Sequence, residues 1–443
     1  VMLDISRDKV PRMPTLYALV DLLASWKINQ FQLYTEHTFA YHDHREVWEH
    51  ASPMTAEQIL DLDAYCRARF IDLVPNQNSF GHMHRWFAHE RYLPLAETET
   101  AFESPWGDMY PPYSLSPAVP ASLDLIDGLY AELLPNFTST LFNVGCDETF
   151  DLGLGKSKTL VEQHGKGRVY LDFLLQIHDR VAAHGRTMQF WGDIINQYPE
   201  LVPEIPRDTI ALEWGYEADH DFPGKSKLFA DSGVPFYVCP GTSSWRSIAG
   251  RTDNCIGNIQ NAVENGLAHG AIGVLNTDWG DEGHWQPLPI SYLGFAYGAA
   301  LSWAHEANRE RDLPAALDAF AFRDRAGVMG QLAYDLGNVY RQTGIPLHNS
   351  SVLFVAYHRN LNAIRRYAQR QNVPDAVRAL LADDDALRAK LNTALETIDQ
   401  VIAPLDQADM TCDDADLIRR EFALAARMLR HGAKRLLLQL PGS

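Results

Sequence analysis

The chain has 443 residues, of which 46% are hydrophobic and 21% charged, with a formal net charge of −19 at pH 7. This composition can fill one barrel-sized domain and a smaller appendage. Because binding phosphate-rich polymers requires clustered Lys and Arg, which the sequence lacks, we expect no nucleic-acid partner. The five scattered cysteines form no Cys-x-x-Cys pair, which predicts free, buried thiols.

Eight β-rich segments alternate with helical patterns from residue 1 to about 307, as expected for βα units around a parallel sheet. Strands are predicted at 1–5, 30–35, 70–74, 140–145, 187–191, 209–213, 235–239 and 271–276. Eight units in this order favour an α/β fold of the (β/α)8 TIM-barrel class over an open doubly wound sheet. The absence of a Gly-x-Gly-x-x-Gly after the first strand further weakens a nucleotide-binding alternative.

Two helices between the early strands have clear sequence signals. The first is predicted to bury Leu16, Leu19, Val20 and Leu23. The second opens with a capping-box pattern, Thr55 with Gln58, and is predicted to bury Ile59, Leu62 and Cys66.

Strand signals stop near Ala307, which predicts a (β/α)8 barrel at 1–307 and a C-terminal helical region at 308–443 packed on it. The helical pattern of the tail places Ile418, Phe422, Ala425 and Leu429 on one face, with Arg419, Arg420, Arg427 and Arg430 opposite. The simplest interpretation of these charged faces is that they are exposed to solvent, and a contact in a homodimer is left open as an alternative.

No run reaches the roughly 20 apolar residues of a membrane span, so no membrane partner is expected. The sequence opens at Val1 inside a predicted strand, with no basic and apolar leader before it. We therefore expect the native chain to begin upstream, and localisation is left open.

Polar and aromatic residues gather where the predicted strands end, which is where TIM barrels carry their catalytic groups. A long segment at 76–120, rich in Pro and aromatic residues, also follows the third strand, and loops of that length are often functional. Carboxylates can accept hydrogen bonds from sugar hydroxyls, and indole faces stack on the C–H face of a pyranose. The strand-end set comprises Asp4, Arg7, Glu36, His37, Asn76, Gln77, Asn78, His82, Asp147, Glu148, Trp191, Asp193, Glu213, Trp214, Tyr237, Trp245, Asp278, Trp279, Asp281 and Glu282.

Each of these residues also has a structural interpretation. An isolated Trp is commonly core, and a strand-end acid is commonly a helix cap, as Asp193 and Asp281 could be. Because acidic and aromatic residues recur together at the fifth, sixth and eighth strand ends, we favour function there. The adjacent carboxylates Asp147 and Glu148 are the strongest indication of glycosidic-bond chemistry.

Metal-dependent and serine hydrolases are weaker alternatives. His42-Asp43-His44 and His82-Met83-His84 resemble His-x-His metal ligands, but such ligands belong at the first strand of a hydrolase barrel. No Gly-x-Ser-x-Gly elbow occurs. We expect no metal ion and no other cofactor.

The segment Asn143-Val144-Gly145-Cys146-Asp147-Glu148 resembles the His-x-Gly-Gly-Asp-Glu motif of glycoside hydrolase family 20, the β-N-acetylhexosaminidases. Further motifs follow in the family's order: 74–82 ending in Gly-His, Trp191-Gly192-Asp193, Trp214, Tyr237 and Trp279-Gly280-Asp281. The resemblance covers residues 1 to about 300.

The resemblance implies a retaining, exo-acting enzyme in which the substrate's own 2-acetamido oxygen attacks the anomeric carbon and forms an oxazolinium intermediate. Glu148 would be the general acid and base, and Asp147 would orient the acetamide. Tyr237 would hold the acetamide oxygen. The walls of the pocket would be formed by Trp191, Trp214 and Trp279. Asp281 would bind distal hydroxyls of the sugar, and His82 would adjust the acidity of the general acid. Asp193 and Trp245 complete the candidate binding set.

The sequence departs from the family pattern at several positions. Asn143 replaces the motif histidine and Cys146 the second glycine. Arg7 is the one candidate in the sequence for the arginine that grips distal hydroxyls, and a counterpart upstream of Val1 is left open. Glu36 suggests an altered distal pocket. An N-acetylgalactosamine preference would fit that change, but the choice between it and N-acetylglucosamine is left open.

The sequence thus predicts a β-N-acetylhexosaminidase that acts on a carbohydrate with a terminal N-acetylhexosamine. One alternative is a retaining glycosidase with a carboxylate nucleophile, such as Glu213, acting on sugars without an acetamido group. Another is a carbohydrate-binding barrel without activity.

Overall fold

The computed structural model describes residues 1–370 and 373–442, which form two compact units. The first unit comprises Val1–Gly215, Asp221–Pro240 and Ala262–Thr277. The second comprises Tyr216–His220, Gly241–Asn261 and the chain from Asp278 onwards. The predicted boundary at Ala307 falls inside the last segment of the second unit and stays a prediction.

The eight predicted strands are all present in the first unit and form a parallel barrel. Parallel pairs join β1 to β2, β2 to β3, and each neighbour from β6 to β10. A bridge between Asn76 and Asn143 joins β3 to β6, and the Met2 amide donates to the Asn276 carbonyl at 2.9 Å, so the ring closes. The strands are β1 (Met2–Asp4), β2 (Gln30–Tyr34), β3 (Asp72–Val74), β6 (Leu141–Asn143), β7 (Thr187–Trp191), β8 (Ile210–Trp214), β9 (Phe236–Cys239) and β10 (Gly273–Val274), followed by β11 (Thr277–Asp278). The predicted TIM barrel is confirmed.

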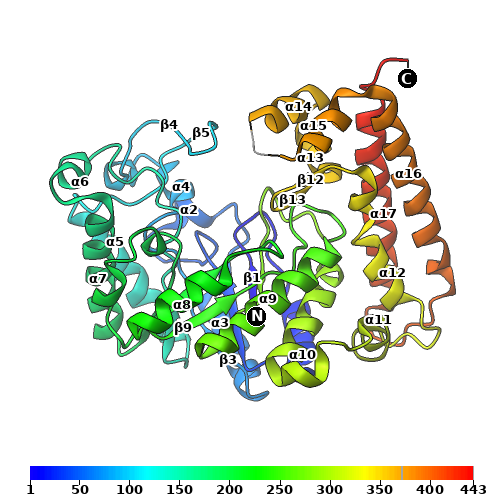
Figure 1. Ribbon diagram of the computed structural model, residues 1–443. Helices are drawn as coiled ribbons and strands as arrows, with labels where there is room; N and C mark the ends of the chain where they lie inside the picture. Colours follow the sequence, from blue (N-terminus) through cyan, green and yellow to red (C-terminus); the bar gives the residue numbers. More distant parts are fainter. Residues whose placement is uncertain (371–372, 443) are drawn as a thin grey trace. The chain divides into compact units, whose positions relative to one another are not determined.

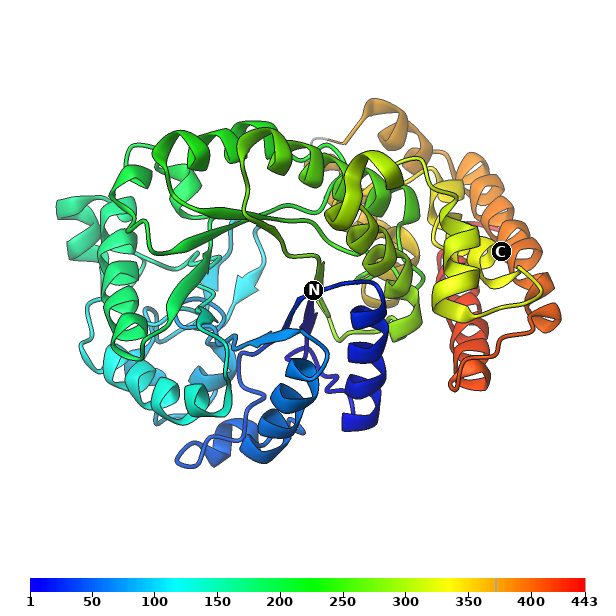
Figure 2. The same ribbon diagram turned by 90° about the horizontal axis from the view of Figure 1, so that it is seen from below.

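Helices follow the strands and cover the outside of the sheet, as the blue-to-green helices of Figure 2 show. Within the first unit, α3 packs on β3, α7 on β7, and α8 on β8 and β9. The longer helices are α1 (Met13–Ser25), α3 (Ala56–Arg67), α5 (Ala121–Leu133), α7 (Lys166–Ala183), α8 (Phe222–Ser232) and α9 (Thr252–His269), and the short ones are α2 (Arg45–Trp48), α4 (His84–Phe87) and α6 (Lys158–His164).

The sequence signals of α1 and α3 are confirmed. The apolar faces predicted for both helices are buried. Thr55 caps α3 through its hydroxyl, which accepts from the Gln58 amide at 3.3 Å, while the Gln58 side chain accepts from the Thr55 amide at 3.0 Å. This reciprocal pair satisfies two N–H groups that a helix start leaves without intrahelical partners.

A layer of buried amides crosses the barrel interior, where bulky aliphatic side chains are usual. Gln32 of β2 lies at its centre. Its Oε1 accepts from Asn76 at 3.1 Å and from Asn143 at 3.0 Å, and its Nε2 donates to Gln189 at 2.9 Å. Because all four side chains are buried, these hydrogen bonds replace water and fix β2, β3, β6 and β7 beneath the ends of the strands.

The long segment after β3 is more structured than the sequence indicated. It contains α4 and a small antiparallel hairpin, β4 (Phe102–Glu103) with β5 (Met109–Tyr110). Figure 1 shows this hairpin, in cyan, projecting from the first unit beyond α4.

The second unit is mainly helical, which confirms the predicted C-terminal helical region. Helix α17 packs on α13 and α16, and buries Ile418, Phe422, Ala425 and Leu429 as predicted. The helices are α10 (Tyr292–Asn308), α11 (Leu313–Leu317), α12 (Met329–Leu336), α13 (Val352–His358), α14 (Leu361–Arg370), α15 (Asp375–Ala382), α16 (Asp384–Ile402) and α17 (Ala415–Leu437), with a hairpin of β12 (Pro346–Leu347) and β13 (Ser350–Ser351).

Two smaller expectations can also be compared with the structure. The cysteines are free thiols, and Cys66, Cys146, Cys239 and Cys255 are buried as predicted, whereas Cys412 is only half-buried. Across 1–370 and 373–442, none of the helices combines the length and apolar character needed to cross a membrane.

Candidate active site

The acidic pair lies on a tightly wound loop directly after β6. Gly145, Cys146 and Glu148 have φ angles of 70°, 69° and 52°. This left-handed region disfavours side chains and costs about 1–3 kcal/mol for a non-glycine residue, so surrounding contacts must hold the loop. Cys146 therefore has a backbone conformation that suits glycine, the residue that the family motif has there.

Three side chains hold the loop by accepting hydrogen bonds from its backbone. The Gly145 amide donates to Asn143 Oδ1 at 3.0 Å, the Cys146 amide to Asn78 Oδ1 at 3.3 Å, and the Glu148 amide to Asp193 Oδ2 at 3.0 Å. Asn143, which stands in place of the motif histidine, is completely buried and shapes the loop from inside the barrel. The Asp193 side chain accepts a hydrogen bond from the Glu148 backbone. It does not cap a helix, which was the structural role considered for it from the sequence.

Gly81 closes the other side of the loop. A Cβ on Gly81 would overlap the carbonyl oxygen of Asp147, so only glycine permits this close approach of two backbones. The Gly-His pair of the sequence is thus explained: Gly81 admits the acidic loop and His82 contacts it.

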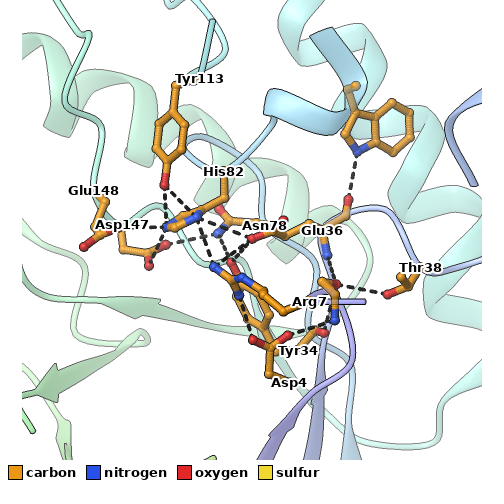
Figure 3. A network of polar contacts seen from close by, with 12 residues as sticks. Asp4, Arg7, Tyr34, Glu36, Thr38, Asn78, His82, Tyr113, Asp147 and Glu148 are labelled. Atoms are coloured by element: carbon orange, nitrogen blue, oxygen red, sulfur yellow. Dashed lines mark hydrogen bonds and ion pairs between the residues drawn. The ribbon is translucent and has the colours of Figure 1, made fainter. Parts of the chain in front are cut away.

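His82 lies at the centre of the site and contacts three carboxylates (Figure 3). Its Nε2 is 3.2 Å from Asp147 Oδ2 and 3.4 Å from Glu148 Oε2, and its Nδ1 is 3.4 Å from Glu36 Oε1. The side chain of Asp147 is only 7% exposed, whereas that of Glu148 is 28% exposed. Of the pair, Glu148 is therefore the carboxylate that an incoming molecule can reach more easily.

Arg7 links the first two strand ends to this centre. Its Nη1 pairs with Asp4 Oδ2 at 2.9 Å, its Nη2 pairs with Glu36 Oε1 at 3.0 Å, and its guanidinium lies over the Tyr34 ring. Glu36 also accepts from the Tyr34 hydroxyl at 2.9 Å. Arg7, the candidate for gripping distal hydroxyls, and Glu36, expected to alter the distal pocket, thus already have protein partners. Figure 3 shows Arg7 below His82.

The charges in the cluster stabilise one another. Burial favours neutral Glu36, but Arg7 and His82 outweigh it and hold the pKa of Glu36 well below its usual range. Burial likewise favours neutral Asp147, but His82 and Asn78 lower the pKa of Asp147. Burial opposes protonation of His82, yet Asp147, Glu148 and Glu36 together raise its pKa well above the ordinary value. His82 is therefore an imidazolium at neutral pH, held among carboxylates.

Asp193 has the opposite behaviour. Burial, followed by repulsion from Asp147, raises its pKa well above the ordinary value. A neutral Asp193 can still accept the hydrogen bond from the Glu148 amide without adding a further negative charge beside Asp147.

Two tyrosines complete the site and were not among the predicted residues. The Tyr34 hydroxyl accepts from Asn78 Nδ2 at 3.1 Å, and Asn78 Nδ2 also donates to Asp147 Oδ1 at 3.1 Å. The Tyr113 hydroxyl lies 2.7 Å from Nδ1 and 3.1 Å from Nε2 of His82. Tyr113 comes from the long aromatic segment after β3, and that segment's composition was the one signal in the sequence that indicated it.

The predicted residues of the later strands of the first unit do not all join this cluster. Trp191 ends β7 and is completely buried, and its amide donates to the Gly145 carbonyl at 2.9 Å. Trp214 ends β8 and is partly exposed. The Tyr237 hydroxyl accepts from Gln30 at 3.5 Å, and Gln30 is the first residue of β2. The Tyr237 side chain thus lies at the amino end of the strands, opposite the end that carries the acidic pair, and this position does not fit contact with the acetamide.

The second unit holds the other predicted residues. The Trp279 indole donates to the Tyr216 hydroxyl at 2.7 Å, and Trp245 packs edge-on against the Tyr216 ring at 5.0 Å. Asp281 is partly exposed, and its neighbour Glu282 pairs with Arg246 at 3.3 Å. Tyr216, which sequence reasoning did not select, is thus the centre of an aromatic group with Trp245 and Trp279.

The rival nucleophile Glu213 is buried and directed at α8. It contacts Lys225 Nζ at 3.5 Å and accepts from Asn196. In each of the two His-x-His pairs, the two histidines have different surroundings. His42 is exposed beside Asp43, whereas His44 is buried against the Tyr92 hydroxyl. His84 stacks on Tyr113, whereas His82 faces the carboxylates.

Comparisons with a family model and with a curated protein both point to one family of enzymes. Residues 1–244 match the model of the glycosyl hydrolase family 20 catalytic domain. Hexosaminidase D of Bos taurus is 26% identical over 232 residues, which are 49% of this chain and 63% of that protein. The chain thus spans less than two thirds of the length of this curated relative.

Two solved structures share the fold at low sequence identity. A Flavobacterium johnsoniae chitobiase superposes with a TM-score of 0.52 at 14% identity, covering 98% of this chain and 72% of that one. The Streptomyces plicatus N-acetyl-β-hexosaminidase, solved in complex with Thio-NAglucal, gives a TM-score of 0.51 at 16% identity, covering 76% and 68%. At these identities the likeness concerns the fold alone.

Proposed function

Because the chain belongs to glycoside hydrolase family 20, we propose that it is an exo-acting, retaining β-N-acetylhexosaminidase that releases a terminal 2-acetamido sugar. The observation that carries this proposal is the division of the acidic pair: Asp147 is buried and paired with His82, whereas Glu148 on the same loop is accessible.

Glu148 is the proposed general acid. It protonates the departing glycosidic oxygen and, as a carboxylate, then removes a proton from the water that opens the oxazolinium intermediate. Asp193 and His82 orient it, the former through the Glu148 amide and the latter through its carboxylate.

Asp147 is the proposed partner of the substrate's acetamide. The lowered pKa of Asp147 keeps it ionised, so it can accept the acetamide N–H and stabilise the positive charge that develops as the acetamide oxygen attacks. Trp191, Trp214, Trp279 and Asp281 are kept as proposed substrate contacts on the strength of the family motif, and Trp245 is kept because it follows a strand end. Whether the sugar is N-acetylglucosamine or N-acetylgalactosamine is decided by rates on the matched pair of nitrophenyl glycosides.

Replacement of Glu148 by Gln tests the proposal. We expect kcat on a β-linked N-acetylhexosaminyl disaccharide to fall by about 10²–10⁴, the usual contribution of a general acid. The loss on a dinitrophenyl glycoside is expected to be smaller, because that leaving group needs little protonation. Hydrolysis is followed by released sugar or phenolate.

The matched control is Glu162→Gln on the exposed face of α6, which should leave both rates unchanged. A thiazoline that mimics the oxazolinium should inhibit the wild type competitively. Full activity of Glu148→Gln, or trapping of a covalent intermediate by a 2-fluoro sugar, would reject the assignment.

A further inference from the structure

The β4–β5 hairpin presents two large apolar side chains to solvent. Trp106 is 52% exposed and Met109 is 66% exposed. The turn between the strands is well formed: the Ser104 amide donates to the Asp108 carbonyl at 2.8 Å, and the Gly107 amide donates to the Ser104 carbonyl at 2.9 Å. Exposed aromatic surface on an ordered turn is a common mark of a binding surface.

The hairpin joins a continuous group of aromatic rings. Trp106 packs edge-on against Phe150 with ring centroids 4.8 Å apart, and lies 6.1 Å from Tyr110. Tyr113 stacks on Phe150 at 5.9 Å and lies 5.9 Å from Tyr110. Phe150 follows Glu148 by two residues, and its amide donates to the Glu148 carbonyl at 2.7 Å. Trp106 is therefore packed against Phe150, the second residue after the acidic pair.

Tyr113 fixes this aromatic group relative to Glu148. Its hydroxyl contacts His82, whose Nε2 is 3.4 Å from Glu148 Oε2. The backbone amides of Tyr113 and Ser114 both donate to Asp151 Oδ2, at 3.3 and 3.1 Å. Figure 3 shows the Tyr113 hydroxyl reaching His82 from above and Glu148 lying to the left of His82.

We propose that Trp106, with Phe150 and Tyr110 beside it, forms the subsite for the leaving group, and that the occupant is a second pyranose. This inference rests on the proposed function, in which Glu148 donates its proton to the oxygen of the leaving group. The departing sugar must then lie on the Glu148 side of the cleaved bond, where the hairpin supplies an indole face for its C–H surface. The exposed Glu103 and Asp108, on the same hairpin, are acceptors suited to its hydroxyls.

The test compares ligands with and without a leaving-group sugar. Trp106→Ala is expected to lower kcat/KM on a β-linked N-acetylhexosaminyl disaccharide by about five- to tenfold, chiefly through KM, as loss of one aromatic stacking contact implies. The inhibition constant of the thiazoline should stay within about twofold, because that inhibitor has no leaving-group sugar. Trp106→Phe should recover part of the loss. The matched control is Trp303→Ala, a tryptophan of α10 that is 70% exposed, which should change neither quantity.

Two results would overturn the subsite. An unchanged kcat/KM of Trp106→Ala on the disaccharide would show that the leaving sugar does not contact Trp106. An equal loss of thiazoline binding and disaccharide turnover in both Trp106 variants would show that the hairpin supports the acidic loop instead. A wild-type protein that neither hydrolyses the disaccharide nor binds the thiazoline would reject the proposed function and the subsite together, so the two failures are distinguishable.

Discussion

His82 is the residue on which the charges of the site depend. It is buried, yet it contacts Asp147, Glu148 and Glu36, and its neighbours from the remaining elements are Arg7, Tyr113 and His84. Burial lowers the pKa of His84 to about 4, so His84 stays neutral and adds no positive charge. One imidazolium thus compensates the carboxylates that Arg7 does not reach.

This arrangement predicts a pH-dependent contribution to stability. The folded-state pKa of His82 lies above the value of about 6.5 for an unfolded histidine. The contribution of His82 to the unfolding free energy is therefore fully present below about pH 6.5 and is lost as the pH rises through the folded-state pKa. Asp147 and Glu36 have lowered pKa values in the folded protein. Their contributions to the unfolding free energy are therefore fully present above about pH 4.5 and are lost as the pH falls further.

We therefore expect the difference in unfolding free energy between the wild type and His82→Asn to be largest between about pH 4.5 and 6.5 and to narrow towards pH 9. Urea unfolding at a series of pH values measures it, with His50→Asn, an exposed position, as the control. A difference that stays constant from pH 6 to 9 would mean that His82 is neutral in the folded protein.

Gly81 provides a second test at the residue scale. Gly81→Ala places a methyl group against the Asp147 carbonyl, so the loop with Asp147 and Glu148 must shift. We expect a loss of about 1–3 kcal/mol in stability and at least a tenfold loss of kcat/KM, because small displacements of catalytic groups are costly. Gly128→Ala in α5 has open space around it and should be neutral or slightly stabilising. Wild-type kinetics for Gly81→Ala would contradict the close packing.

At the scale of elements, the strands are held together by the amide layer as well as by their backbone ladders. Gln32 connects β2 to the side chains of Asn76, Asn143 and Gln189, and Asn143 in turn accepts the Gly145 amide at the start of the acidic loop. The layer therefore couples packing inside the barrel to the position of the acids.

Gln32→Leu removes the acceptor that Asn76 and Asn143 share and the donor to Gln189, so three buried amides lose this partner. Each unpaired group costs about 1–3 kcal/mol, so we expect a loss of at least about 2 kcal/mol in unfolding free energy. Gln176→Leu, on the exposed face of α7, should change stability by no more than about 0.5 kcal/mol. Equal midpoints in urea for the two variants would show that the layer contributes little.

At the scale of the whole molecule, the second unit combines loops of the barrel sequence with the C-terminal helices. The Asn349 amide donates to Glu217 at 2.7 Å, the Ser351 amide to the Arg246 carbonyl at 2.9 Å, and Asn338 Nδ2 to Asp253 at 2.8 Å. Residues 216–220 and 241–261 thus find their partners far along the chain.

Truncation after Ala307 should therefore expose buried polar groups, including Arg251, which is paired with Glu217. We expect residues 1–307 alone to be poorly soluble or to lose cooperative unfolding, as judged by yield and by a thermal melt against the full chain. A cooperative melt at the full-length midpoint would instead support the boundary that the sequence predicts.

The sequence determined the local and periodic features of this protein. Features that depend on residues close together in the chain can be predicted without a structure. They include the alternation of strands and helices, the buried faces of α1 and α3, the Thr55 capping box and the acidic pair after β6. Tertiary structure decided what depends on residues far apart.

It brought Tyr113 to His82 and Arg7 to Glu36, and it set the amide layer inside the barrel. It also turned Tyr237 towards Gln30, because the position of a side chain along a strand, at one end of a barrel or the other, is fixed by the register with its neighbours and not by its own residue type.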